Sequence, residues 1–111
     1  MGEQHVDHHV AARVVRMGLF LARFGGAAFG FEVWTPLVAT RIVDVTAVYE
    51  RKVAALREHA SQLEYTDHVH KALGMHAQRS LYLPAASRYG EAFRPLGPPS
   101  DEERRVLEGL R

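Results

Sequence analysis

The chain has 111 residues, of which 47% are hydrophobic and 24% charged, and its formal net charge at pH 7 is +1. This length suits one small domain that buries about two thirds of its extended-chain surface in a modest core. The near-neutral charge argues against nucleic acid or an anionic membrane as the main partner. Because the sequence has no cysteine, disulfides and thiolate metal sites are excluded, and any metal must use imidazole and carboxylate ligands.

Neither a secretory signal nor a membrane span is predicted. The first residues lack a basic segment followed by an apolar one. The stretch 17–39 is apolar on average, but Arg23, Glu32 and Pro36 interrupt it. With the absence of cysteine, these features are compatible with a cytoplasmic location, which we expect.

Apolar side chains recur at helical spacing between Asp7 and Phe24, which predicts an amphipathic helix that Gly25 and Gly26 end. Its apolar stripe consists of Val10, Val14, Met17, Leu21 and Phe24. Residues 31–34 and 41–45 are two short β-rich runs. We expect these two runs to lie close together in one sheet or ribbon.

Thr46 is expected to cap the next helix, which has the clearest apolar stripe in the chain. The stripe consists of Val48, Tyr49, Val53, Leu56, Ala60 and Leu63, and Lys52 flanks it. Thr66 or Asp67 is expected to cap a third helix, which runs through Leu73 and is weakened at Gly74.

The end of the chain contains a short extended piece at residues 89–93 and a proline-rich break at residues 95–99. Ser100 and Glu103 then form a capping box, which predicts a short terminal helix from Asp101 to Leu110.

The order helix, strand, strand, helix, helix, strand and tail helix predicts a mixed α/β fold. Residues 1–96 are expected to form a partial domain, and residues 97–111 a proline-rich break with a short terminal helix. No opening strand precedes the first helix, so we expect the second half of a domain. So small a sheet leaves edges that need a neighbour.

The motif His5-Val6-Asp7-His8 lies at the start of the first predicted helix and has residue types that suit a zinc site. His8 would ligate the metal, and Asp7 could orient an imidazole by accepting its N–H. His5, one turn earlier, could approach a metal-bound substrate without ligating. Taken alone, these four residues are more often solvated histidines that bind metal adventitiously.

Later segments follow this motif in a specific order. They are His5-x-Asp7-His8 followed by Ala11-Ala12, then Phe31-Glu32-Val33-Trp34-Thr35-Pro36, Val43-Asp44-Val45-Thr46, Glu50-Arg51-Lys52-x-x-Ala55-Leu56-Arg57-x-His59-x-Ser61-Gln62, and Tyr89-Gly90-Glu91-Ala92-Phe93-Arg94. In their succession and spacing they resemble the PIG-L family of deacetylases, also called LmbE-like. The resemblance covers about residues 2–96.

This resemblance implies the second half of a Rossmann-like α/β domain and a zinc-dependent hydrolase with a metal-bound water as nucleophile. Its substrates would be N-acetylglucosaminyl-type sugar conjugates, from which it removes the acetyl group. His8 matches the family's third zinc ligand. His5 matches the histidine that steadies the oxyanion or protonates the departing amine, and Asp7 has a supporting role. The family's proline in this motif is Val6 here.

The family's opening motif, H-P-D-D-E, supplies the other two zinc ligands and the general base, and nothing in this chain matches it. Catalytic zinc needs three protein ligands and a water. We therefore expect weak zinc binding and no useful hydrolysis unless an N-terminal half complements the chain. The alternative is a non-catalytic α/β remnant that acts through self-association or partner binding. The acetylated sugar, the oligomeric state and the activity of the chain by itself are left open.

Other residues have a structural interpretation beside the functional one. A solvated helix end is favoured over a substrate pocket for His59 and Ser61-Gln62, and a turn acceptor over a ligand for Asp44. For Glu91 a structural role is at least as well supported, and Trp34 is expected to be a core or interface aromatic. A second metal site is disfavoured for His68, His70 and His76, because their offsets of 2 and 6 do not place them on one helical face.

Overall fold

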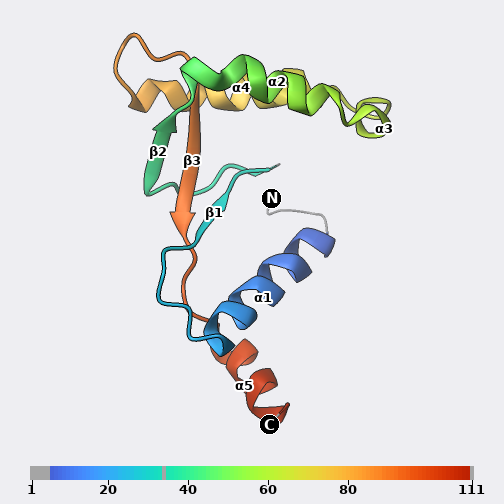
Figure 1. Ribbon diagram of the computed structural model, residues 1–111, viewed down its shortest axis with the longest axis vertical. Coiled ribbons are helices and arrows are strands. Elements are labelled where there is room, and N and C mark those ends of the chain that lie inside the picture. The colour runs from blue at the N-terminus through green and yellow to red at the C-terminus, as the bar shows by residue number, and fades with distance from the viewer. Residues whose placement is uncertain (1–5, 34, 111) are drawn as a thin grey trace.

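The computed structural model describes residues 6–33 and 35–110. Its elements are α1 (Val6–Leu21), β1 (Phe29–Phe31), β2 (Arg41–Asp44), α2 (Tyr49–Arg57), α3 (Ala60–Leu63), α4 (His68–Arg79), β3 (Gly90–Pro95) and α5 (Asp101–Gly109). A small sheet lies in the middle, with α2 and α4 across one end and α1 and α5 at the other (Figure 1). The expected α/β class is therefore confirmed as a mixture of helices with a small antiparallel sheet. No helix among the described residues is long and apolar enough to cross a membrane.

The sheet has the strand order β1-β3-β2, and both pairings are antiparallel. The last strand in the sequence is thus the central one, and its Phe93 pairs with Phe31 on one side and Arg41 on the other. The first β-rich run was expected at residues 31–34, but β1 overlaps it only at Phe31. Strands β1 and β2 do share one sheet, and β3 separates them. A Cβ atom at Gly90 would lie 2.9 Å from Ile42 Cγ2, so only glycine fits where β3 begins against β2.

Helix α1 ends earlier than the glycine pair that was expected to stop it. Arg23 has a left-handed backbone with φ of 51°, and the Phe24 N–H donates to the Leu19 carbonyl over 3.0 Å. This bond, from the N–H of a residue five positions further along the chain, closes the helix as a Schellman motif, in which a left-handed residue is usual. The helix therefore ends by its own capping geometry, before Gly25 is reached.

The expected helix from Thr46 to Leu63 is divided into a 3₁₀ turn at Thr46–Val48, α2 and α3. The prediction that Thr46 caps it was wrong, because the Thr46 hydroxyl accepts the backbone N–H groups of Arg88 (2.9 Å) and Tyr89 (3.2 Å) instead. The hydroxyl thus joins the start of α2 to the chain just before β3. At His59 the backbone leaves the helical conformation, with ψ of 55°, and separates α2 from α3.

Helix α4 begins where the sequence predicted and continues well beyond Gly74, to Arg79. Asp67 is its N-cap, and its carboxylate accepts the His70 N–H over 2.9 Å. This bond satisfies one of the free N–H groups of the first turn.

Replacing Asp67 by alanine is expected to lower the free energy of unfolding by about 1 kcal/mol, because the first turn of α4 loses its acceptor. Urea denaturation measures this change. Glu64→Ala is the matched control, since Glu64 lies just after α3 and is exposed. Equal effects of the two substitutions would show that the cap contributes nothing.

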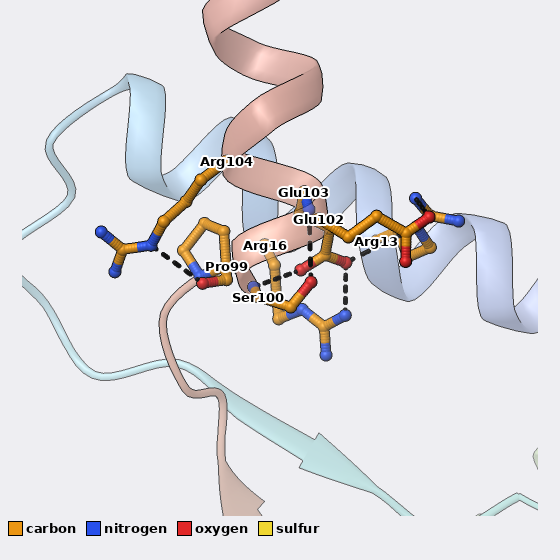
Figure 2. Close-up of polar contacts among 7 residues, drawn as sticks. All are labelled: Arg13, Arg16, Pro99, Ser100, Glu102, Glu103 and Arg104. Carbon is orange, nitrogen blue, oxygen red and sulfur yellow. Dashed lines mark hydrogen bonds and ion pairs between the residues drawn. The ribbon is translucent and has the colours of Figure 1, made fainter.

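The predicted capping box at the start of α5 is confirmed. The Ser100 hydroxyl accepts the Glu103 N–H over 3.3 Å, and the Glu103 carboxylate accepts the Ser100 N–H over 2.8 Å. Figure 2 shows that the same carboxylate also binds α1, through Arg16 at 2.5 Å and Arg13 at 3.6 Å. One buried carboxylate therefore caps α5 and fastens it to α1.

The apolar core is smaller than the composition predicted. Among the described residues, the buried hydrophobic ones are Tyr49, Ala92 and Leu107. No residue of α1 is buried, and three members of the apolar stripe that defined this helix in the sequence, Val10, Val14 and Leu21, are more than half exposed. The expectation of a modest core fails because the elements spread along the sheet axis instead of enclosing it (Figure 1).

Candidate functional site: a histidine-lined cavity

A cavity of about 600 Å³ lies between the start of α1, the segment after β1, and helices α2 to α4. Five of its lining side chains are apolar: Phe31, Val33, Leu56, Ala72 and Met75. The polar side chains are His8, Glu32, Lys52, His59, Gln62, His68, Lys71 and His76. The cavity thus combines apolar walls with four imidazoles, which is a composition suited to a small ligand.

Only some of the predicted site residues line this cavity. His8 lines the cavity, whereas Asp7 is exposed and is not part of the lining. His5 lies outside the described residues, as does Trp34. His59 and Gln62 are exposed, as expected for a helix end, yet both also line the cavity beside His8.

The centre of the polar wall is His76, which is 6% exposed. The Tyr49 hydroxyl lies 3.3 Å from its Nδ1, and the Lys52 ammonium lies 3.3 Å from its Nε2. An ammonium can only donate, so Nε2 accepts, and a neutral ring then carries its proton on Nδ1 and donates it to the tyrosine oxygen. Burial, and next the Lys52 ammonium, lower the pKa of His76 to about 4.

Two neighbouring groups fix this arrangement. Lys52 also forms an ion pair with Glu91 on β3, which ties the cavity wall to the sheet. Tyr49 stacks on Tyr89, with ring centroids 3.7 Å apart and planes 9° apart. Burial raises the pKa of Tyr49 and lowers that of Lys52. Glu91 therefore has a structural role, as the sequence analysis considered: it holds Lys52 against the sheet.

We expect NMR titration of the His76 ring to give a midpoint near 4. A histidine whose folded pKa lies below its unfolded value of 6.5 binds fewer protons in the native state. Its stabilising contribution is present above pH 6.5 and is lost as the pH falls towards 4. Urea denaturation across this window should show a decline that is smaller in His76→Gln. A His70→Gln control should keep the full decline, and an unchanged profile in His76→Gln would contradict the assignment.

Glu32, which lines the cavity, forms an ion pair with Arg79 that the sequence analysis did not identify. The Glu32 side chain is 2% exposed and that of Arg79 10%. Glu32 accepts from Arg79 Nε over 3.2 Å and from the Leu37 N–H over 2.7 Å, with a second guanidinium bond beside them. Arg79 also donates to the Leu37 carbonyl over 2.9 Å. This network fixes the segment after β1 against the end of α4.

Asp44 is a turn acceptor, as the sequence favoured. Its carboxylate accepts the Ser87 hydroxyl over 2.5 Å and the Thr46 N–H over 2.9 Å. These hydrogen bonds, with that from Ser87 the strongest, lower the pKa of Asp44. Asp44 is exposed and does not line the cavity.

The described residues alone do not fit a zinc ion. In residues 6–33 and 35–110, no group of three or more histidine, aspartate or glutamate side chains is arranged to hold a metal. His68 and His76 line the cavity with His8, whereas His70 does not. Imidazoles therefore gather in one cavity without forming a closed coordination shell.

The sequence analysis did not identify three residues of this polar cluster as site residues: Tyr49, Lys52 and His76. Tyr49 was assigned to the core stripe of its helix and Lys52 to the flank of that stripe. Their spacing of three residues did place both on one helix face. His76 was set aside with His70, although only the packing of α4 against α2 decides which of them faces the cavity.

No protein-family model, no curated protein and no solved structure matches this chain.

Proposed function

We propose that this chain is the C-terminal part of a metal-dependent N-deacetylase of the PIG-L, or LmbE-like, family. The complete domain would be Rossmann-like and cytoplasmic, and would remove acetyl from an N-acetylglucosaminyl-type conjugate. His8 would be one zinc ligand, with His5 and Asp7 in the supporting roles that the resemblance implies. The other ligands and the general base would come from a complementing N-terminal half.

One observation supports this proposal above the others. The sequence segments that resemble the family are far apart in the chain, yet several of their residues line one cavity. Those residues are His8, Phe31, Glu32, Val33, Lys52, Leu56, His59 and Gln62. Residues that merely conform to a pattern by chance have no reason to meet at one site, so their meeting favours a shared functional origin.

The residues of this chain have roles that do not need the metal. The apolar wall formed by Phe31, Leu56 and Met75 can hold the face of a sugar ring. Lys52 and His76 are held in place by Glu91 and Tyr49, so their hydrogen-bonding groups are oriented before a ligand arrives. When bound, zinc would supply Lewis acidity.

The test is a reconstitution. The chain is mixed with zinc and with an N-terminal polypeptide of a PIG-L deacetylase that carries H-P-D-D-E and ends before the H-x-D-H motif. Co-elution establishes assembly, and amine release from an N-acetylglucosaminyl conjugate measures activity. We expect activity only in the mixture, and a loss of at least about 100-fold in His8→Ala because a ligand is removed.

His70→Ala is the matched control, since His70 lies on α4 but outside the cavity lining. It should leave the reconstituted activity unchanged. An assembled complex that binds zinc stoichiometrically, releases no amine and is indifferent to His8→Ala would sink the proposal.

A further inference from the structure

Both lysines of the chain, Lys52 and Lys71, line the histidine-lined cavity. They come from two helices, α2 and α4, which pack against each other (Figure 1). Among the described residues, the only acid in the lining is Glu32. Its carboxylate already accepts from Arg79 and from the Leu37 N–H. The described wall of the cavity therefore has two ammonium groups and no free carboxylate.

The Lys52 ammonium has one hydrogen-bond donor left for a ligand. An ammonium has three N–H groups. Two of them serve Glu91 and His76 Nε2, the latter over 3.3 Å. No described residue accepts the third, and the Lys52 side chain is 31% exposed, so a molecule in the cavity can reach it. Because Glu91 and His76 hold the ammonium in place, this N–H is oriented before a ligand binds.

Lys71 contributes a positive charge that no acid of the described chain balances. Glu91 balances Lys52 and Arg79 balances Glu32, whereas Lys71 forms no ion pair with another described residue. Lys71 lies on α4 one turn before Met75, which is also in the lining. The uncompensated charge is therefore located at the cavity wall.

We propose that the ligand of this cavity is a sugar conjugate with an anionic substituent, a phosphate or a carboxylate, which Lys52 and Lys71 bind. Leu56, Ala72 and Met75 from the same two helices would hold the apolar face of the ring. Hydrogen bonds from an ammonium to a phosphate or carboxylate are about twice as strong as neutral ones, so they favour the anionic conjugate over a neutral one. The inference rests on the proposed deacetylase, because it names a class of substrate for the same cavity.

The test is a calorimetric titration of the full chain without zinc. The probes are N-acetylglucosamine 1-phosphate, N-acetylmuramic acid, which has a carboxylate, neutral N-acetylglucosamine and inorganic phosphate. We expect at least one of the two anionic sugars to bind about 10-fold or more tightly than N-acetylglucosamine and inorganic phosphate. Whether the sugar phosphate or the sugar carboxylate binds more tightly identifies the anion.

Lys71→Gln should weaken the binding of this anionic sugar about 5-fold or more and leave that of N-acetylglucosamine unchanged. Arg51→Gln is the matched control, because Arg51 is an exposed cation on α2 outside the described lining. It should leave the binding of both sugars unchanged.

A second measurement needs no variant. Limited acetylation with acetic anhydride, followed by peptide mass spectrometry, follows both lysine side chains at once, because the chain has no others. The anionic sugar should slow the acetylation of Lys52 and Lys71, and N-acetylglucosamine at the same concentration should not. Equal affinity for neutral and anionic sugars, or no binding of either anionic sugar, would overturn the inference. So would inorganic phosphate bound as tightly as the sugar phosphate, or protection of neither lysine.

These outcomes are distinct from a failure of the deacetylase proposal, since the titration needs neither zinc nor an N-terminal half. If the reconstituted enzyme releases amine equally fast from neutral and anionic conjugates, the deacetylase stands and the inference on the anion fails. If the cavity selects the anionic sugar but the assembled complex releases no amine, the anion site stands and the deacetylase fails.

Discussion

Replacing Arg79 by methionine is expected to lower the free energy of unfolding by about 3 to 5 kcal/mol, because it leaves the Glu32 carboxylate buried without its counter-ion. Glu32 would retain only the Leu37 N–H among the contacts described above. The substitution should also loosen the segment after β1, which forms one wall of the cavity. Urea denaturation measures the loss of stability, and hydrogen exchange at Leu37 measures the loosening.

The double variant Arg79→Met/Glu32→Leu is the informative control. Replacing a whole buried pair by apolar side chains of similar volume is often close to neutral, whereas removing one charge is not. We therefore expect the double variant to recover most of the stability that Arg79→Met loses. Arg51→Met, on the exposed side of α2, should change little. A double variant as unstable as the single one would mean that packing, and not charge, explains the loss.

Replacing Glu103 by glutamine is expected to release α5 from α1. Glu103 is 2% exposed and joins Arg13, Arg16 and the Ser100 N–H, so all these contacts lose their charged acceptor together. Hydrogen exchange should become faster throughout α5. Glu102→Gln is the neighbouring control, because Glu102 is 81% exposed and lies 3.9 Å from Arg13. It should leave exchange in α5 unchanged.

The lowered pKa of Glu103 also leads us to expect that acid weakens the contact between α5 and α1. The hydrogen bond from Arg16, and next that from the Ser100 backbone, lower the pKa of Glu103 from 4.5 to about 2. A depressed carboxyl pKa stabilises the fold above the unfolded value, and this contribution is lost as the pH falls from 4.5 through 2. Acid should therefore separate α5 from α1 in the wild type. In Glu103→Gln, where α5 is already released, the same fall in pH should cause no further separation.

Helices α4 and α5 begin where the sequence predicted because local interactions decide where they start. The capping box at Ser100 and Glu103 and the cap at Asp67 involve residues three positions apart, so short-range hydrogen bonding decides them. The wrong assignment of Thr46 has the opposite origin. Its hydroxyl could have capped a helix, but the chain before β3 brings two other N–H groups to it.

In the candidate site, too, local sequence motifs could be recognised in advance, whereas contacts between distant segments could not. The sequence singled out His8 from its motif, and the described structure places it in a cavity with His59 and Gln62. The neutral state of His76 could not be read from the sequence, because it depends on burial and on Lys52 and Tyr49 from another helix. The role of Glu103 as the link between α5 and α1 was equally hidden, since its partners lie near the other end of the chain.

The sequence by itself determined the order of helices and strands, the capping box of α5 and the histidine motif, and it narrowed the cap of α4 to Thr66 or Asp67, because each depends on residues a few positions apart. Only the tertiary structure decided that β3 lies between β1 and β2 and that Glu32 pairs with Arg79. It also decided that Val6, Val10 and Val14 of α1 are left exposed. Periodicity shows that a helix has an apolar face, but whether another element covers that face depends on how distant segments pack.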